Sequence, residues 1–288
     1  MPELPEVESI RRKLNQILPK RQIQNVEVRR DKSFLAFPTT SEEILNNTVI
    51  EVKRRAKILQ IVLSGERDLL VHLKMTGQLI FVDKDGQRAG GGHPSADWVN
   101  ELPGKHTRVI FYFHDGSRLF FNDMRVFGWI RSPLKTEVDQ EFVNYGPDID
   151  DSNLSADYLL NAAKRRQIPI KQFIMDNAVI CGVGNIYASE SLFATNINPT
   201  KPAREISKKE MTKLMKAMQK IIARSTQLGG TTFDGKYVGV DGFAGGFQKE
   251  LKVYGRDGQS CLNCGQAINK IKQGGRGTFF CPSCQKHQ

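Results

Sequence analysis

The start of the chain combines an amine with two carboxylates. The sequence begins Met1-Pro2-Glu3-Leu4-Pro5-Glu6, and we expect Met1 to be removed because Pro2 is small enough for the processing enzyme. The mature chain would then begin with a secondary amine, which is partly neutral at pH 7 because an α-amine has a pKa of about 7.7–8.0. Such an amine can attack an aldehyde-like carbon to form an iminium, and Glu3 and Glu6 can shuttle protons. The alternative is that this segment only begins a helix.

Four of the five cysteines have the spacing of zinc ligands. Cys261, Cys264, Cys281 and Cys284 form two C-x2-C pairs separated by sixteen residues, and four-thiolate zinc sites have a central gap of about 15–20 residues. Four sulfur ligands fill a tetrahedral ion and leave no open position, so we expect one structural Zn²⁺. Two disulfides are the alternative, which is unusual in a cytosolic chain. We expect the fifth cysteine, Cys181, to be a small buried hydrophobe.

The charge of the chain points to a polyanionic partner. Its 42 Lys and Arg against 31 Asp and Glu give 42 − 31 = +11, and nucleic acid is the commonest partner of so basic a protein. Ribosomal RNA, a membrane surface or plain solubility remain open. Hydrophobic residues make up 39%, which excludes a disordered chain or a coiled coil. No apolar run approaches the ~20 residues of a membrane span, and the acidic start is unlike a signal peptide, so we expect a cytoplasmic protein.

The first half of the chain has the pattern of one helix followed by antiparallel strands. Apolar residues at three- and four-residue spacing predict a helix over 5–18. The predicted strands cover 25–29, 58–63, 69–73, 78–82, 107–113 and 118–122. Asp115-Gly116 lies between the last two strands and is a strong hairpin signal. The Gly-rich segment Gln87–Pro103 is interpreted as a long loop.

The second half has a helical pattern and ends in the cysteine pairs. Helices are predicted over 155–165, 170–175, 185–196 and 207–227. The longest begins Ser207-Lys208-Lys209-Glu210, a capping box, and its methionines are interpreted as core residues. The segment between the two cysteine pairs is long enough for a two-stranded hairpin. Ser132–Ser152, with its prolines and acids, is interpreted as a linker.

The N-terminal motif resembles the signature of bacterial formamidopyrimidine-DNA glycosylases, and the resemblance continues along almost the whole chain. The matching motifs, in order, are PELPEVE (2–8), RRAK (54–57), HLKMTG (72–77), DMRVFG (123–128), MDN (175–177), GVGNIYASE (182–190), GGTT (229–232), VYGR (253–256) and GRGTFFC (275–281). So many motifs in the right order make coincidence implausible.

The resemblance implies a two-domain α+β fold. We expect an N-terminal catalytic antiparallel β-sandwich with flanking helices over 1–132 and a linker over 133–151. A helical helix–two-turn–helix domain with a capping loop would cover 152–248, and a zinc-finger β-hairpin would cover 249–288.

The resemblance also implies catalytic roles for four residues. Pro2 is similar to the Schiff-base nucleophile that attacks the deoxyribose C1′, and Glu3 to the acid that protonates the sugar ring oxygen or the leaving base. Lys57 matches a lysine assigned to β-elimination and phosphate contact. Arg276 matches an arginine assigned to phosphate binding and δ-elimination. Glu6 is expected to support the first two residues.

Further positions match the family's DNA contacts. Met75, Arg125 and Phe127 resemble the side chains that fill the gap left by a flipped base, although Met124 and Val126 stand where the family often has Pro and a second Arg. The residues expected to contact the DNA backbone are His72, His106, Arg166, Lys171, Asn185 and Tyr254, with Arg125 contacting the orphaned cytosine. Gly235–Gly246 aligns with the loop that caps the flipped base.

The function implied is excision of 8-oxoguanine and formamidopyrimidines from double-stranded DNA, followed by strand nicking through β,δ-elimination. We expect a monomer that does not engage a membrane. One alternative is an endonuclease VIII-like glycosylase for oxidised pyrimidines, whose usual N-terminus has Gly where this chain has Leu4. A second is a non-catalytic zinc-ribbon protein that binds DNA or RNA. The sequence does not rank the oxidised purines or define the opposite-base preference beyond cytosine.

Overall fold

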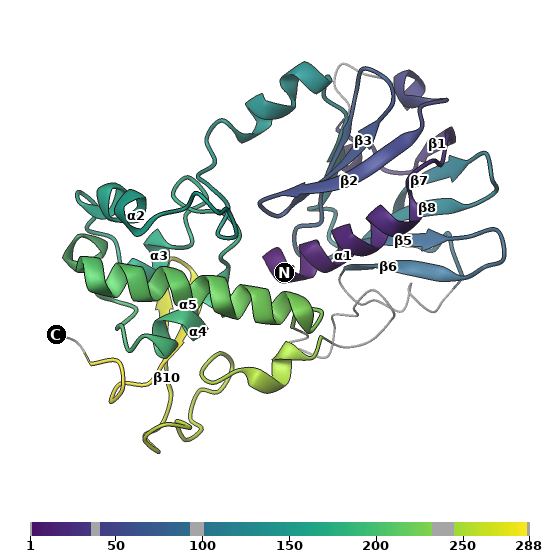
Figure 1. Cartoon of the computed structure of the whole chain (residues 1–288). Helices are drawn as coiled ribbons and strands as arrows, with labels where there is room; N and C mark the ends of the chain where they lie inside the picture. Colours follow the sequence, from purple (N-terminus) through teal and green to yellow (C-terminus); the bar gives the residue numbers. More distant parts are fainter. Residues whose placement is uncertain (1, 36–40, 93–100, 232–244, 287–288) are drawn as a thin grey trace. The chain divides into compact units, whose positions relative to one another are not determined.

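The chain divides into two compact units, whose helices and strands are labelled in Figure 1. The computed structural model describes residues 2–35, 41–92, 101–231 and 245–286. The first unit comprises Met1–Val143 and Leu228–Gly246, and the second comprises Asn144–Gln227 and Phe247–Gln288. The expected linker at 133–151 contains the division between the units, together with a 3₁₀ helix at Lys135–Phe142. Leu228–Gly246, which sequence analysis placed in the helical domain, groups with the first unit instead.

The first unit begins with helix α1, Leu4–Ile17. Pro5 suits the first turn, where a missing N–H costs nothing, and the backbone N–H of Glu3 donates to Glu6 Oε2 at 2.8 Å. Val7, Ile10 and Leu14 are fully buried on one face of the helix. The predicted helix is confirmed to within one residue at each end.

The strands of the first unit form two antiparallel sheets. One has five strands in the order β1 (Ile23–Val28), β7 (Thr107–Phe113), β8 (Arg118–Asp123), β5 (Gly77–Val82) and β6 (Arg88–Gly92). The other has four in the order β2 (Val49–Arg55), β3 (Ile58–Leu63), β4 (Leu69–His72) and β9 (Trp129–Arg131). One hydrophobic core joins inward side chains from both sheets and α1, including Ile10, Leu59, Leu79 and Phe121. The predicted antiparallel β-sandwich with a flanking helix is confirmed.

Three of these strands were not predicted. β6 lies inside Gln87–Pro103, which was expected to be a loop. Gly90 and Gly92 adopt φ values of +138° and +135°, and a Cβ at either position would collide with the β5 backbone. Only glycine fits this close approach, so the strand has the composition of a loop. β2 and β9 were also missed; β2 is largely polar and β9 has only three residues.

The second unit contains four α-helices among the described residues: α2 (Ala156–Ala163), α3 (Ile170–Phe173), α4 (Asn185–Ala194) and α5 (Lys208–Gln227). All four were predicted, with ends that differ by up to two residues. The capping box of α5 is present, because Ser207 N donates to Glu210 Oε2 at 2.8 Å and Glu210 N donates to Ser207 Oγ at 3.3 Å. Met211 and Met218 are fully buried, which confirms that they are core residues.

A two-stranded hairpin lies near the end of the second unit. β10 (Asn269–Gln273) pairs antiparallel with β11 (Arg276–Phe280). Phe279 and Ile268 pack with Phe193 of α4 in a small core, so the hairpin is anchored to a helix. Among the helices that the structure describes, none is long and apolar enough to cross a membrane.

Candidate active site and nucleic-acid interface

The N-terminal carboxylates are buried rather than solvated. Pro2 is buried, and Glu3 and Glu6 expose only 4% and 2% of their surface. Glu6 Oε2 accepts the Glu3 N–H, while Glu6 Oε1 accepts the N–H and hydroxyl of Thr231 at 2.8 and 3.1 Å. A Cβ on Gly230 would lie 2.6 Å from Glu6 Oε1, so the GGTT motif needs its second glycine here. Glu6 therefore joins the start of α1 to the segment before residue 232.

Lys57 lies in the two-residue turn between β2 and β3. Arg55 pairs with Ile58 in the hairpin register, which leaves Ala56 and Lys57 as the turn. Ala56 has a φ of +53°. The Arg54 side chain donates from Nη1 to the Ala56 carbonyl at 3.0 Å and from Nε to Glu8 of α1 at 3.2 Å. Hydrogen bonds from Arg54 thus connect the turn that carries Lys57 to α1, the helix that directly follows Pro2 and Glu3.

His72 is held as a neutral ring beside two lysines. Burial, together with the smaller effects of the charges of Lys74 and Lys57, lowers its pKa from the ordinary 6.5 to about 3. The Lys74 backbone N–H donates to His72 Nδ1 at 3.0 Å, so the ring proton lies on Nε2. The structure therefore brings Lys57 and His72 together, with Nε2–H available as a neutral donor.

The residues predicted to fill a vacated base stack lie on two connected turns. Met75 and Phe127 are 41% and 55% exposed, unusual values for large apolar side chains. Arg125 Nη1 approaches Met75 Sδ at 3.6 Å. Buried Asp123 secures both turns: its carboxylate accepts the Thr76 hydroxyl and, at 2.7 Å, the Gly128 N–H.

The same region includes His106, another predicted DNA contact. His106 is half-buried immediately before β7, and its carbonyl accepts the Asp123 N–H at 2.9 Å. Arg125 N also donates to Thr76 Oγ1 at 3.0 Å. Hydrogen bonds to Asp123 and Thr76 therefore hold the segments that carry His106 and Arg125. Met75 directly precedes Thr76, and Phe127 directly precedes Gly128, whose N–H donates to Asp123.

In the second unit, Lys171 is buried inside a hydrogen-bond network. It is 1% exposed, and its Nζ donates to Asn185 Oδ1 at 2.6 Å, Thr278 Oγ1 at 2.7 Å and the Gly277 carbonyl at 3.1 Å. Asn185 Nδ2 donates in turn to the Tyr254 hydroxyl at 3.3 Å. The structure thus joins Lys171, Asn185 and Tyr254 into one cluster, in which the lysine bonds to the protein itself.

The hairpin tip presents Arg276 to solvent. Gly274 and Gly275 have φ values of +52° and +76°, and the register pairs Gln273 with Arg276. Two consecutive central residues with positive φ define a type I′ turn, in which glycine is favoured. Arg276 is exposed, as is Arg166, whose Nη1 lies 4.0 Å from Asp176 Oδ2. Arg276, Lys171 and Asp176 are among the residues that line a pocket of about 230 Å³.

The four cysteines of the zinc pattern converge. Their sulfur atoms all lie within 4.8 Å of one another, with Cys261 Sγ 3.9 Å from Cys284 Sγ and Cys264 Sγ 3.5 Å from Cys281 Sγ. Zn–S bonds of about 2.3 Å in a tetrahedron place sulfurs about 3.8 Å apart, so the set fits one zinc ion. All five cysteines are free thiols rather than disulfides. Cys181 is fully buried, as expected.

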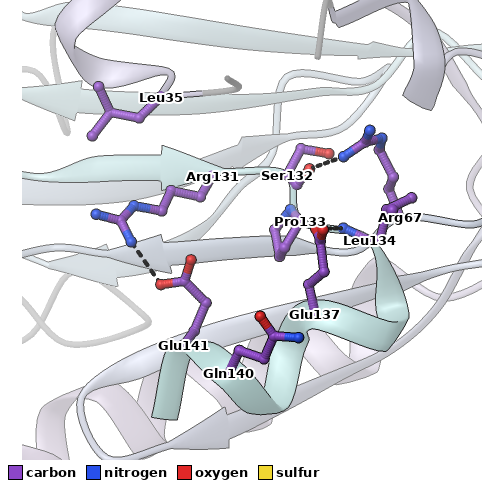
Figure 2. Close-up of a pocket in the computed structure, with 9 residues that line it drawn as sticks. All are labelled: Leu35, Arg67, Arg131, Ser132, Pro133, Leu134, Glu137, Gln140 and Glu141. Carbon is purple, nitrogen blue, oxygen red and sulfur yellow. Dashed lines mark hydrogen bonds and ion pairs between the residues drawn. The ribbon is translucent and has the colours of Figure 1, made fainter. Parts of the chain in front are cut away.

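A separate pocket of about 430 Å³ in the first unit contains none of the predicted site residues (Figure 2). Its two arginines are engaged by the protein: Arg131 Nη1 donates to Glu141 Oε2 at 2.6 Å, and Arg67 Nη1 donates to the Ser132 carbonyl at 2.7 Å. Glu137 Oε2 accepts the Leu134 N–H at 3.1 Å. The pocket is lined by these residues with Leu35, Pro133 and Gln140, and we do not assign the active site to it.

Comparisons with known proteins agree along the whole chain. Residues 1–130 match the formamidopyrimidine-DNA glycosylase N-terminal domain, residues 145–236 the H2TH domain of the same enzyme, and residues 258–286 the zinc finger found in FPG and IleRS. The formamidopyrimidine-DNA glycosylase of Rickettsia africae is 41% identical over 287 residues, which cover 99% of each chain. The chain belongs to the formamidopyrimidine-DNA glycosylase family. The family member from Rickettsia bellii is 36% identical over 289 residues, covering 99% of this chain and 100% of its own.

Solved structures of the family have the same fold. A Lactococcus lactis variant in complex with Fapy-dG containing DNA superposes with a TM-score of 0.88 at 28% identity, covering 99% of this chain and 100% of that one. The Lactococcus lactis enzyme with DNA containing an abasic site gives a TM-score of 0.86 at the same identity and coverage. The helix–two-turn–helix and zinc-finger parts of the expected fold are thereby confirmed.

Sequence reasoning did not assign several buried residues that hold the segments carrying the predicted site residues within each unit. Glu190 of α4 is 4% exposed and accepts the N–H groups of Lys252, Val253 and Tyr254 at 2.8–2.9 Å. Burial raises the pKa of Glu190, although these three hydrogen bonds act against the rise. Asp123 and the Glu8–Arg54 pair were also not assigned. The sequence signal that could have identified Glu8, Asp123 and Glu190 is that each is an acidic residue inside one of the family motifs. The predicted capping loop, Gly235–Gly246, lies outside the described residues except for its last two.

Proposed function

We propose that this chain is a base-excision repair glycosylase that removes 8-oxoguanine and formamidopyrimidines from duplex DNA and then nicks the strand by β,δ-elimination. The observation that carries the proposal is the N-terminal arrangement: Pro2 and two buried carboxylates lie at the start of a helix, and Glu6 bonds to both Glu3 and Thr231. It is supported by the names of the full-length relatives and by a Lactococcus lactis neighbour whose DNA contains Fapy-dG.

Base excision begins at the Pro2 nitrogen. The neutral amine attacks C1′ of the damaged nucleotide, and the bond from C1′ to the base breaks with its electrons leaving on the base. Glu3 supplies a proton to the sugar ring oxygen or to the departing base. The positive end of the α1 dipole lowers the pKa of a nearby amine and so increases its neutral fraction. The Pro2 nitrogen loses its proton to solvent, and the bond from C1′ to the ring oxygen O4′ then breaks as O4′ takes up a proton. The nitrogen lone pair forms a cationic iminium at C1′, which prepares the opened sugar for elimination.

Strand cleavage proceeds from that iminium. Removal of a C2′ proton, which we assign to Lys57, converts the iminium to an enamine. The enamine nitrogen lone pair then expels the phosphate as the bond from C3′ to its oxygen breaks, which leaves a conjugated iminium. A second elimination releases the phosphate at C5′, and we assign Arg276 to binding the phosphate for that step. Arginine suits this role because its planar fork can form two hydrogen bonds with a phosphate.

DNA binding uses both units. A glycosylase must extrude the damaged nucleotide and fill the gap, and Met75, Arg125 and Phe127 are exposed side chains suited to that task. His72, His106, Arg166, Asn185 and Tyr254 are the proposed DNA-backbone contacts. Asn185 begins α4, where free N–H groups favour a phosphate.

A separate experiment tests the proposal that Lys171 contacts DNA. Its ammonium already has three protein acceptors, which favours an indirect role through Asn185 and the hairpin. Retained phosphate-dependent binding by a Lys171→Met chain with an intact hairpin would support that indirect role.

The zinc ion would stabilise the structure of the hairpin and would take no part in the reaction. Bound by Cys261, Cys264, Cys281 and Cys284, it would hold the base of the hairpin whose tip carries Arg276. We further propose that the enzyme acts as a monomer in the bacterial cytoplasm, with damaged duplex DNA as its partner.

The deciding experiment is borohydride trapping. Untagged protein is mixed with a duplex that carries one 8-oxoguanine opposite cytosine, reduced, and mapped by mass spectrometry. We expect a covalent adduct on Pro2. No adduct with this duplex or with an oxidised pyrimidine, despite verified Met1 removal and bound zinc, would indicate a binding protein without the chemistry.

A second candidate is glycosylase activity on oxidised pyrimidines. One observation favours it: a Lactococcus lactis family member was solved with DNA containing an oxidised pyrimidine, and it superposes with a TM-score of 0.86 at 28% identity. An adduct that forms only with the oxidised pyrimidine would transfer the assignment to this activity.

A further inference from the structure

Arg54 is a buried cation that bridges two elements of the first unit. Its side chain is 7% exposed, and that of its partner Glu8 is 12% exposed. Glu8 belongs to α1 and Arg54 to β2, so their 3.2 Å contact joins the helix to the hairpin. The second arm of the guanidinium reaches the Ala56 carbonyl at 3.0 Å. A planar fork with separate donors can serve two such acceptors at once, whereas a lysine presents a single ammonium.

The Ala56 carbonyl belongs to the peptide that sets the type of this turn. In a two-residue hairpin turn, a type I′ turn needs positive φ at both central residues, and a type II′ turn needs it only at the first. Ala56 has a φ of +53°, and Lys57 is not among the described residues with positive φ. The turn at Ala56 and Lys57 therefore has the φ pattern of a type II′ turn. The two forms differ in the orientation of the peptide between Ala56 and Lys57, and Arg54 bonds to the oxygen of that peptide.

The orientation of this peptide determines where Lys57 points. Rotating the peptide would force Lys57 toward positive φ, which is costly for a residue with a Cβ, and would redirect its side chain. In the observed form, the Lys57 charge is close enough to His72 to depress the pKa of the imidazole. Ala56 itself is 1% exposed, so the turn is packed as well as bonded.

We propose that the Glu8–Arg54 ion pair is a positioning device for Lys57, which it holds in the turn conformation used for β-elimination. The inference rests on the proposed function, in which Lys57 removes the C2′ proton. Glu8 orients Arg54, Arg54 holds the Ala56 carbonyl, and the carbonyl sets the backbone of Lys57. The device connects Lys57 to the helix that begins beside Pro2, so the nucleophile and the base share one support.

Glu8 is ionised under working conditions, as this device requires. Burial raises the pKa of Glu8, but the hydrogen bonds from Arg11 and Arg12 and the charges of Arg11 and Arg54 outweigh burial, so the net shift is downward. Arg11 contacts Glu8 at 2.9 and 3.0 Å and Arg12 at 2.9 Å. Arg29, which pairs with Glu27 rather than with Glu8, offers a matched control.

The test is a double-mutant cycle on single-turnover kinetics with a preformed abasic site. Arg54→Lys keeps the charge beside Glu8 but carries all its donors on one nitrogen, so it cannot occupy both the Nε position beside Glu8 and the Nη1 position beside the Ala56 carbonyl. We expect the rate of borohydride-trapped adduct formation on Pro2 to stay within about twofold of wild type and β-elimination to slow about tenfold, a loss typical of a misplaced proton-transfer group. Arg29→Lys, the same substitution outside the Glu8 cluster, should behave as wild type in both steps.

The cycle separates positioning from general destabilisation. If Arg54 acts through Lys57, then Arg54→Lys should add no further slowing to Lys57→Ala. The proposal is overturned if Arg54→Lys slows β-elimination equally in the wild-type and Lys57→Ala chains, or if it slows β-elimination in neither. Glu8→Gln is the second variant in case Arg54→Lys fails to fold, and it should slow elimination in the same direction; normal elimination by Glu8→Gln would overturn the proposal.

The cycle also distinguishes this inference from the function on which it rests. Elimination at the wild-type rate by Lys57→Ala would refute the role of Lys57, and the positioning proposal would fall with it. Slow elimination by Lys57→Ala combined with normal elimination by Arg54→Lys would refute only the positioning proposal.

Discussion

The Glu6 carboxylate accepts two hydrogen bonds from Thr231, a residue 225 positions further along the chain. Its other oxygen accepts the N–H of Glu3. One buried carboxylate therefore connects the proposed catalytic end of the protein to the segment that leads into residues 232–244. Any change in the position of Thr231 would be transmitted through Glu6 to the backbone of Glu3, which directly follows the proposed nucleophile Pro2.

Replacing Glu6 with Gln should weaken both the fold and the chemistry. An amide has only one acceptor oxygen, so at least one buried N–H that Glu6 now serves would lose its partner, at a cost of about 1–3 kcal/mol. We expect a matching loss in the free energy of unfolding, measured in urea, and a slower single-turnover excision of 8-oxoguanine. Glu51→Gln is the control, because Glu51 is exposed beside Lys53. Unchanged stability and unchanged excision together would refute this role of Glu6.

A permanent N-terminal extension should abolish both excision and nicking. An extension converts the Pro2 nitrogen into a tertiary amide, which has no free electron pair for attack at C1′. The measurement is cleavage of an 8-oxoguanine duplex by the extended chain, before and after a protease restores Pro2 as the first residue. The same extension at the C-terminus serves as the control. Normal nicking by a chain whose extension is verified by mass spectrometry would contradict the iminium mechanism.

Removing zinc should abolish DNA binding and leave the first unit folded. The zinc cluster lies in the second unit, and metal binding to four thiolates supplies folding free energy directly to small domains. We expect a chelator to release one zinc per chain and to eliminate binding to duplex DNA, while the β-sandwich signals in a two-dimensional NMR spectrum persist. Cys181→Ala should retain zinc, since Cys181 is buried away from the four-cysteine cluster. Full DNA affinity after verified zinc loss would show that the hairpin is not needed for binding.

The stability of the fold should depend on His72 in mild acid. Because the folded pKa of His72 is about 3 and its ordinary value is 6.5, the unfolded chain takes up this proton first. The stabilisation is complete above about pH 6.5 and is lost as the pH falls from there toward 3, with a slope of at most about 1.4 kcal/mol per pH unit. His72→Asn should flatten this part of the unfolding profile.

The control for the pH experiment is His114→Gln, because His114 is exposed on the β7–β8 turn. It should leave the slope between pH 6.5 and 3 unchanged. An identical slope of stability against pH for wild type and His72→Asn would show that His72 is protonated in the folded protein. That result would contradict the hydrogen bond that His72 Nδ1 accepts from the Lys74 N–H.

The local elements, the cysteine cluster and the family could be predicted from the sequence alone. The α1 and α5 helices follow from the spacing of apolar residues and from capping boxes that involve residues three positions apart, and the zinc cluster follows from the spacing of two cysteine pairs. The order of the motifs indicated the family. These features could be predicted because each depends on residues that are neighbours in the chain or on a short pattern that few other structures share.

The tertiary structure decided the partners of these residues. β6 forms because β5 leaves room only for glycine, so its sequence alone has the pattern of a loop. The burial of Lys171, the pairing of Glu6 with Thr231 and the connection of Arg54 to both Glu8 and Ala56 each join residues that the sequence does not mark as neighbours. Buried polar groups must find hydrogen-bond partners, but which partner is within reach depends on how the elements pack. That packing places Pro2, Lys57 and Arg125 on segments that are held by hydrogen bonds from residues elsewhere in the chain.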